Sequence, residues 1–293
     1  MFDIGELLEP TTLQEAVQAY AARPDLKVIA GGTDVLIRMR HGDFAGAGLL
    51  SLRGIPGLDQ ITLLEDGTLS IGAMAPFTRV TEDSLVRTLT PILVEAAGSV
   101  GGPQVRNVAT LGGNLCNGAV SADSASTLFV LEANLRLESA AGTRLLPITE
   151  FYAGPGKVNL RPGEILAAVL IPPSGYRDMG GTYIKYAMRK AMDIATLGVA
   201  AACRVREGRF EVLRLALGVA GPVPFRCAEA EAHAVGRPAT AETIQEIAEL
   251  AKKPANPRTS WRASKEYREH LITVLTQRAV AEAAQRGGGC CGR

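Results

Sequence analysis

The sequence predicts an α+β fold, and this prediction rests on the order of the expected helices and strands along the chain. A unit that alternates strands with helices opens the chain, a mixed region with two hairpins follows, and strands succeeded by helices close it. With 293 residues, the chain has room for two domains or three small ones. Its 47% hydrophobic and 21% charged residues are typical of a globular protein with a sizeable core.

The N-terminal unit is expected to contain two helices and two strands. Thr12 can cap the periodic run that follows it, and Pro24-Asp25 supplies the turn before a short buried strand. The expected ranges are 13–22 and 35–39 for the helices, and 27–30 and 48–52 for the strands.

The middle region is expected to combine hairpins and helices around a glycine-rich stretch. The alternating residues around Asp66-Gly67 and Ala141-Gly142 are typical of hairpins. The stretch 101–118 shows neither a helical nor a strand period. The expected ranges are 58–70 and 135–146 for the hairpins, 89–100 and 123–131 for the helices, and 164–172 for a closing strand.

A Pro-Pro-Ser-Gly stretch at 172–175 is the best candidate for a domain boundary. Three antiparallel strands and three helices are expected after it, at 181–189, 198–206, 210–218, 227–235, 241–252 and 260–285. We therefore divide the chain into subdomains 1–54 and 55–175, a C-terminal domain 176–286 and a disordered tail 287–293.

Charge and hydropathy exclude several classes of partner. A formal net charge of +1 without a basic run argues against a nucleic-acid surface. The N-terminus has no basic segment followed by an apolar one, and no apolar run approaches the roughly 20 residues that span a bilayer. We expect no membrane association and a cytoplasmic location.

The cysteines and histidines predict no metal or iron–sulfur site on this chain. None of the five cysteines forms a CxxC pair, and the three histidines are widely separated. Cys116 is expected to be a small packing residue rather than a redox group. Cys290 and Cys291 could serve a metal or a disulfide, but two adjacent thiols make a poor site.

Two Gly-Gly loops, at 30–34 and 109–114, are the segments most suited to binding chemistry. Paired glycines let backbone N–H groups converge on an anion, and Thr33, Thr110 and Asn114 add side-chain donors. Two such loops could hold the two phosphates of a dinucleotide. Neither fits the GxGxxG fingerprint, and a tight turn is the commoner meaning of a Gly-Gly pair.

Three segments resemble the FAD-binding subunit of bacterial xanthine dehydrogenases and, more widely, the flavin subunits of molybdenum hydroxylases. They are KVIAGGTDVLIRMR, VRNVATLGGNLCNGAVSADSAS and TSWRASKEYREHL. The resemblance runs from residue 1 to about 284, and its SWRASKE part is more particular to the xanthine dehydrogenase branch. It implies a vanillyl-alcohol-oxidase/PCMH-type FAD-binding fold of two α+β subdomains, with a C-terminal α+β domain of antiparallel sheet and helices.

The resemblance also implies a set of FAD-binding residues. Both glycine loops would hold the pyrophosphate, a carboxylate after the second loop would contact the cofactor, and two later strands would lie near the flavin. The matching residues are Lys27, Val28, Ile29, Ala30, Gly31, Gly32, Thr33, Asp34, Ala109, Thr110, Leu111, Gly112, Gly113, Asn114, Asp123, Ile165, Leu166, Ile184 and Lys185. Val100 stands where vertebrate relatives carry an aromatic residue near the flavin.

The implied function is electron transfer within a complex. Electrons would pass from [2Fe-2S] clusters on a small subunit through FAD to NAD+, and a large subunit would carry the molybdenum cofactor, in a heterotrimer or its dimer. No general acid or base is nominated on this chain. The alternatives are a carbon monoxide, aldehyde, nicotinate or hydroxybenzoyl-CoA type of molybdenum hydroxylase, a stand-alone flavin oxidoreductase of the same fold, and a flavin-free scaffold.

Overall fold

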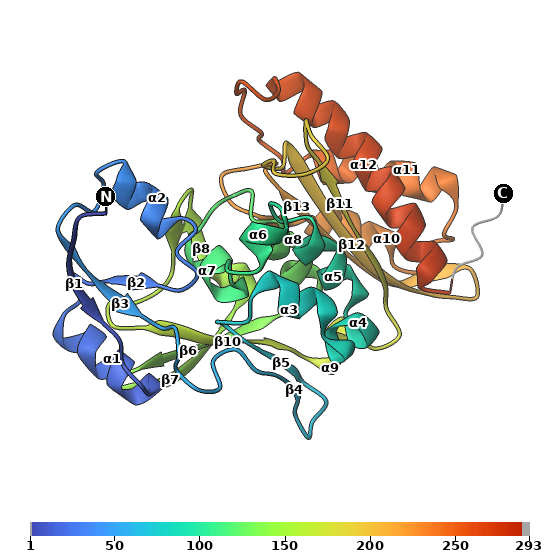
Figure 1. Cartoon of the computed structure of the whole chain (residues 1–293). Helices are drawn as coiled ribbons and strands as arrows, with labels where there is room; N and C mark the ends of the chain where they lie inside the picture. The colour runs from blue at the N-terminus through green and yellow to red at the C-terminus, as the bar shows by residue number, and fades with distance from the viewer. Residues whose placement is uncertain (1, 289–293) are drawn as a thin grey trace.

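The computed structural model describes residues 2–288 (Figure 1). It contains sheets of three, five and four strands together with helices, which confirms the α+β class. The predictions for Cys290, Cys291 and the end of the tail lie outside the described residues.

The N-terminal unit is a parallel three-stranded sheet of order β1-β3-β2 with two helices. Its elements are β1 (Ile4–Leu8), α1 (Leu13–Ala22), β2 (Lys27–Ile29), α2 (Val35–Arg40) and β3 (Ala47–Ser51). The Thr12 side chain accepts the N–H of Glu15, which confirms the predicted cap. Strand β1 was not predicted, because it lies at a sheet edge and its largely exposed residues show no buried face.

The second region is built on an antiparallel sheet of order β4-β5-β10-β6-β7, and both predicted hairpins are confirmed. Its strands are β4 (Ile61–Leu63), β5 (Leu69–Gly72), β6 (Asn134–Ser139), β7 (Gly142–Pro147) and β10 (Ile165–Ile171). Central strand β10 packs on both faces. Val169 and Ile171 enter the large core of this region, whereas Ile165 and Ala167 pack with the N-terminal unit.

Short helices and a small ribbon complete this region. They are α3 (Phe77–Glu82), α4 (Ser84–Leu89), α5 (Pro91–Gly98), α6 (Pro103–Arg106), α7 (Leu111–Cys116), α8 (Asp123–Val130), η1 (Ile148–Glu150), α9 (Pro173–Tyr176), β8 (Tyr152–Gly154) and β9 (Lys157–Val158). The prediction of one helix over 89–100 was wrong, because Pro91 begins a new helix after Thr90. The expectation of no helix within 101–118 was also wrong, since Pro103 and the Thr110 cap each begin one.

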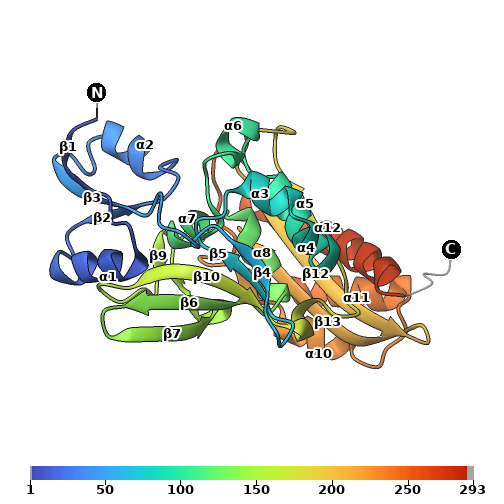
Figure 2. The same ribbon diagram turned by 60° about the horizontal axis from the view of Figure 1, so that its bottom comes forward.

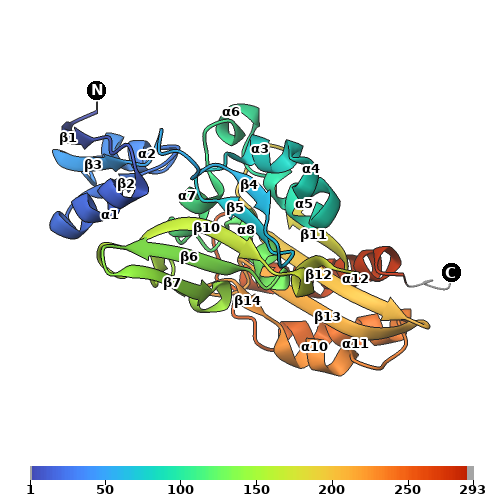
Figure 3. The same cartoon turned by 90° about the horizontal axis from the view of Figure 1, so that it is seen from below.

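The C-terminal region is an antiparallel four-stranded sheet between two layers of helices (Figures 2 and 3). Its elements are β11 (Gly180–Tyr186), β12 (Leu197–Arg206), β13 (Arg209–Gly218), β14 (Phe225–Arg226), α10 (Ala228–Ala234), α11 (Ala241–Lys252) and α12 (Lys265–Arg286). Helices α10 and α12 pack on one face, where α11 packs on both of them, and α5 and α8 cover the other face. Alternate residues of β12 therefore enter two different cores, as Val199 and Ala200 do.

The ends of two predicted elements differ from those expected here. Strand β11 stops at Tyr186, which leaves 187–196 as a connecting loop. Helix α12 begins later than expected, because Ser264 caps it. At the other end, Gly287 accepts the N–H of Val205, so chain packing extends into the tail predicted to be disordered. In residues 2–288, no helix combines the length and apolar character needed to cross a bilayer.

Candidate functional site

A cavity of about 900 Å³ lies among the three regions of the chain. Its lining includes the first glycine loop and α2 from the N-terminal unit, and the 100–123 segment and the start of β10 from the second region. The C-terminal region contributes residues 189, 192–194, 261 and 262. A pocket of this volume suits a ligand of cofactor size.

The first glycine loop presents a row of unbonded backbone N–H groups. Strand β2 ends at Ile29, and the N–H groups of 31–34 donate no hydrogen bond to any described residue. Gly32 has a φ of +77°, a left-handed conformation that turns successive N–H groups toward one side. Because burying an unbonded N–H is costly, this row in a cavity lining is suited to an anion such as a phosphate.

The two glycine loops touch each other. A Cβ at Gly31 would lie 1.9 Å from the carbonyl oxygen of Val108, so only glycine allows this approach. In the second loop, the N–H groups of Leu111 and Gly112 donate to Ala75 and Ala73 at 3.0 and 2.8 Å. The Thr110 side chain accepts the N–H of Gly113 at 3.0 Å. The second loop therefore uses these glycine N–H groups inside the protein, unlike the first.

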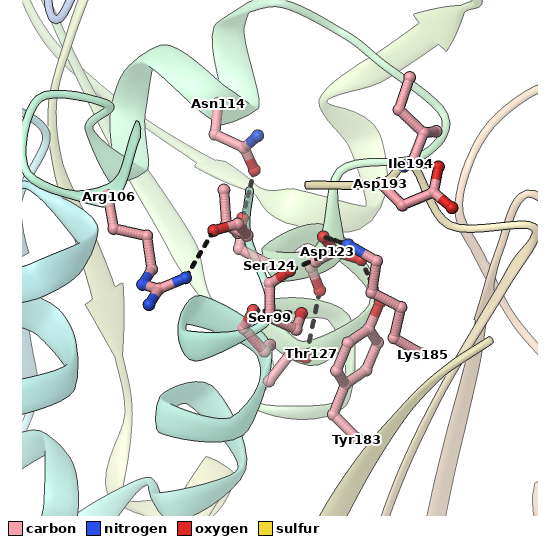
Figure 4. A network of polar contacts seen from close by, with 12 residues as sticks. Ser99, Arg106, Asn114, Asp123, Ser124, Thr127, Tyr183, Lys185, Asp193 and Ile194 are labelled. Atoms are coloured by element: carbon pink, nitrogen blue, oxygen red, sulfur yellow. Dashed lines mark hydrogen bonds and ion pairs between the residues drawn. The ribbon is translucent and has the colours of Figure 1, made fainter. Parts of the chain in front are cut away.

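A buried ion pair joins α8 to β11 beside the cavity (Figure 4). The carboxylate of Asp123, only 6% exposed, accepts bonds from Tyr183 Oη at 2.7 Å and Lys185 Nζ at 2.8 Å. Burial raises the pKa of the Asp123 carboxyl, and the positive charge of Lys185 opposes that rise. Lys185 also donates to the carbonyl of Ser99 at 3.0 Å, so the ammonium is held from both sides.

Most of the predicted FAD-binding residues lie in the cavity wall. Those that line it are Lys27, Val28, Ala30, Gly31, Gly32, Thr33, Asp34, Ala109, Thr110, Gly112, Gly113, Asn114, Asp123, Ile165 and Leu166. Those outside the lining are Ile29, Leu111, Ile184 and Lys185. Lys185 still reaches the site indirectly through Asp123, whereas Leu111 is a fully buried core residue.

Several lining residues were not predicted. They include Tyr20, Arg38, Met192, Trp261 and Arg262. One sequence signal could have identified Trp261 as a candidate site residue. It is the only tryptophan of the chain, and it stands in a polar segment beside an arginine. Trp261 is 74% exposed, which is unusual for such a large apolar residue.

Cys116 also lines the cavity, and its environment favours packing. Burial raises the pKa of the Cys116 thiol to about 12, which keeps it protonated near neutral pH. Within residues 2–288, no group of three or more histidine, cysteine, aspartate or glutamate side chains could hold a metal ion. The lining thus supplies hydrogen-bond donors for an anion, apolar walls and cations.

Two family models match most of the chain. The FAD binding domain in molybdopterin dehydrogenase matches residues 2–174, and the CO dehydrogenase flavoprotein C-terminal domain matches residues 182–283. The first of these descriptions names FAD, whose pyrophosphate is an anion of the kind that the unbonded N–H groups of the first loop suit.

Relatives from two named organisms match this chain over nearly its whole length. The xanthine dehydrogenase FAD-binding subunit of Escherichia coli O157:H7 is 46% identical, over 99% of both chains. The nicotinate dehydrogenase FAD-subunit of Eubacterium barkeri is 30% identical, over 97% of this chain and 98% of the relative.

Solved structures also match over nearly the whole chain. A chain of quinoline 2-oxidoreductase from Pseudomonas putida 86 superposes with a TM-score of 0.91 at 32% identity, over 97% of this chain and 98% of the other. A chain of carbon monoxide dehydrogenase from Hydrogenophaga pseudoflava superposes with a TM-score of 0.93 at 28% identity, over 98% and 99%. The expected FAD-binding fold with a C-terminal α+β domain is confirmed by these likenesses.

Proposed function

The chain belongs to the FAD-binding subunits of molybdenum hydroxylases, and from that membership we propose that it relays electrons in a xanthine dehydrogenase-type complex. In this proposal, electrons pass from partner [2Fe-2S] clusters through FAD on this chain to NAD+. A large subunit carries the molybdenum cofactor and a small subunit carries the clusters, and the complex acts in purine catabolism in the cytoplasm.

The observation that carries the proposal is the row of unbonded N–H groups at 31–34 in the cavity wall. Such donors stabilise the charge of a phosphate by hydrogen bonding and do not require a side-chain cation. Gly31 keeps this row against the second loop, where the side chains of Thr110 and Asn114 also line the cavity. We infer that the two loops together hold the FAD pyrophosphate.

The remaining predicted residues shape the rest of the binding site. Ile165 and Leu166 supply an apolar wall that excludes water, and both are at most 3% exposed. Asp123 is fixed by Tyr183 and Lys185, so its position in the lining is preorganised. When bound, FAD supplies the conversion between one-electron and two-electron transfer, which suits a step between iron–sulfur clusters and a nicotinamide.

The substrate is set by a partner chain in this proposal. Relatives named for xanthine, nicotinate and carbon monoxide are similar to this chain in sequence over nearly its whole length, so another molybdenum hydroxylase is the second candidate. A stand-alone flavin oxidoreductase is disfavoured by the match of the C-terminal domain model to residues 182–283.

Purification of the native complex tests the assignment. We expect a large and a small subunit to copurify with this chain, and molybdenum and iron to be present. Acid precipitation should release FAD into the supernatant, about one per copy of this chain, because no residue is expected to link the flavin covalently. A chain purified without partners and active alone on a small substrate would point to the stand-alone enzyme.

A further inference from the structure

A rigid turn carries Trp261 and Arg262 to the cavity wall. The N–H of Ser260 donates to the carbonyl of Ala263 at 3.0 Å, and the N–H of Ala263 donates back at 3.2 Å. The guanidinium of Arg262 stacks on the indole, with its central carbon 4.2 Å from the ring centroid. Both side chains line the cavity, although Trp261 is largely exposed.

A buried arginine ties this turn to the neighbouring loop. Arg268, 2% exposed, donates to the Ser260 hydroxyl at 2.9 Å and to the carbonyl of Thr196. Thr196 ends the 187–196 loop, whose residues Met192 and Ile194 also line the cavity. The two loops of the C-terminal region are thus held in one arrangement before any ligand binds, which lowers the entropy lost on binding.

This corner of the molecule has excess positive charge. Burial lowers the pKa of the Arg268 guanidinium, and the charges of Arg258 and Arg262 lower it further. No ion pair of residues 2–288 includes any of these three arginines. The buried Nε groups of Arg262 and Arg268 have no hydrogen-bond partner within the described part of the chain.

Nearby carboxylates do not neutralise the cluster. Asp193 accepts the N–H groups of Arg189 and Ile194, each at 2.9 Å, and pairs with the Arg189 side chain. Glu266 is exposed, and its pKa is lowered by its own N–H and by Ser264. An unpaired guanidinium beside an exposed indole is suited to a phosphate that carries an aromatic base.

We propose that Trp261 and Arg262 form a nucleotide subsite, in which the indole stacks on adenine and the guanidinium binds a phosphate of the dinucleotide that exchanges electrons with FAD. The inference rests on the proposed function, because it names where that function would hold NAD+ or NADH. A protein partner would instead need apolar contact over a wide surface, whereas Trp261 and Arg262 line a concave site.

The single tryptophan makes the subsite directly measurable. ADP-ribose, which lacks nicotinamide, is titrated into the FAD-loaded chain while Trp261 fluorescence and flavin absorbance are recorded. We expect saturable quenching with no loss of flavin. Arg262→Gln should weaken binding by about tenfold, the usual loss for a charged hydrogen bond. Arg87→Gln, an exposed arginine outside the cavity lining, should leave the affinity unchanged.

Flavin reduction by NADH tests the same residues in turnover. The NADH concentration for half-maximal reduction rate should rise by about tenfold in Trp261→Ala, whereas Trp261→Phe keeps the aromatic face and should stay near wild type. The maximal rate should change little, because neither residue is assigned to hydride transfer.

The outcomes separate this inference from the proposed function. Normal NADH reduction in every variant, or no effect of ADP-ribose on Trp261, would overturn the subsite and leave the relay intact. Binding of ADP-ribose with loss in Arg262→Gln, but no reduction of wild-type flavin by NADH, would support the subsite and overturn NAD+ as the acceptor.

Discussion

Gly31 is the residue on which the contact between the two glycine loops most depends. Its φ is not in the left-handed region, so the requirement for glycine comes from the 1.9 Å approach to Val108 rather than from backbone strain. Gly32 has the other requirement, a positive φ of +77°. The sequence predicted both loops from their glycines alone and could not separate these two reasons.

We predict that Gly31→Ala abolishes FAD binding, because the added Cβ forces the loops apart. Gly175→Ala is a matched control, since its Cβ would meet the carbonyl oxygen of Leu131 at 2.1 Å outside the cavity lining. Both variants should lose stability, but the folded fraction of the control should keep its flavin. Flavin content per folded chain is the measurement, and full occupancy in Gly31→Ala would show that the loop contact is not needed.

Cys116 provides a second test at the scale of one residue. With a pKa of about 12, its thiol should resist iodoacetamide at pH 8 in the folded protein, because the thiolate is the reactive form. The same protein in denaturant should be alkylated rapidly at this position. Peptide mass spectrometry reads the modification, and fast labelling in the native state would favour a redox role.

At the scale of elements, local signals were sufficient where they acted alone. The turns at Asp66-Gly67 and Ala141-Gly142 and the Thr12 cap were predicted because each depends on neighbours in sequence. Strand β1 and the split at Thr90 were missed. An exposed edge strand shows little hydrophobic pattern, and Pro91 can begin a helix as readily as it can interrupt one.

The ion pair between α8 and β11 gives a pH-dependent prediction. In Lys185→Met, the Asp123 carboxyl loses the charge that opposes the rise of its pKa. A carboxyl whose folded-state pKa is raised contributes its stability below the unfolded pKa and loses it as pH rises through the folded pKa. The variant should therefore be destabilised at pH 8, by the roughly 3 kcal/mol that removing one partner of a buried ion pair costs, and should be destabilised less at pH 5.

Urea unfolding at the two pH values measures this difference. Tyr183→Phe is the control, because it removes only a neutral donor to Asp123 and should cost about 1 kcal/mol. Equal destabilisation of Lys185→Met at both pH values would show that Asp123 does not titrate as its burial indicates.

At the scale of the whole molecule, the site depends on packing among three regions. The glycine loops could be predicted as candidates from composition, and the resemblance added Asp123, Ile165 and Leu166. Trp261 and Arg262 were missed, because tertiary packing of β11, β12 and α12 brings them to a cavity lined by the first region. No local sequence pattern indicates which distant segments line the same cavity.

Anaerobic flavin reduction tests the relay most directly. The FAD-loaded chain and the assembled complex are each mixed with xanthine, and flavin bleaching is followed. We predict bleaching in the complex alone, because in the proposed relay the electrons of xanthine reach this FAD only through the [2Fe-2S] clusters of a partner chain. Dithionite, which needs no partner, should bleach both samples. Bleaching of the isolated chain by xanthine would contradict the account.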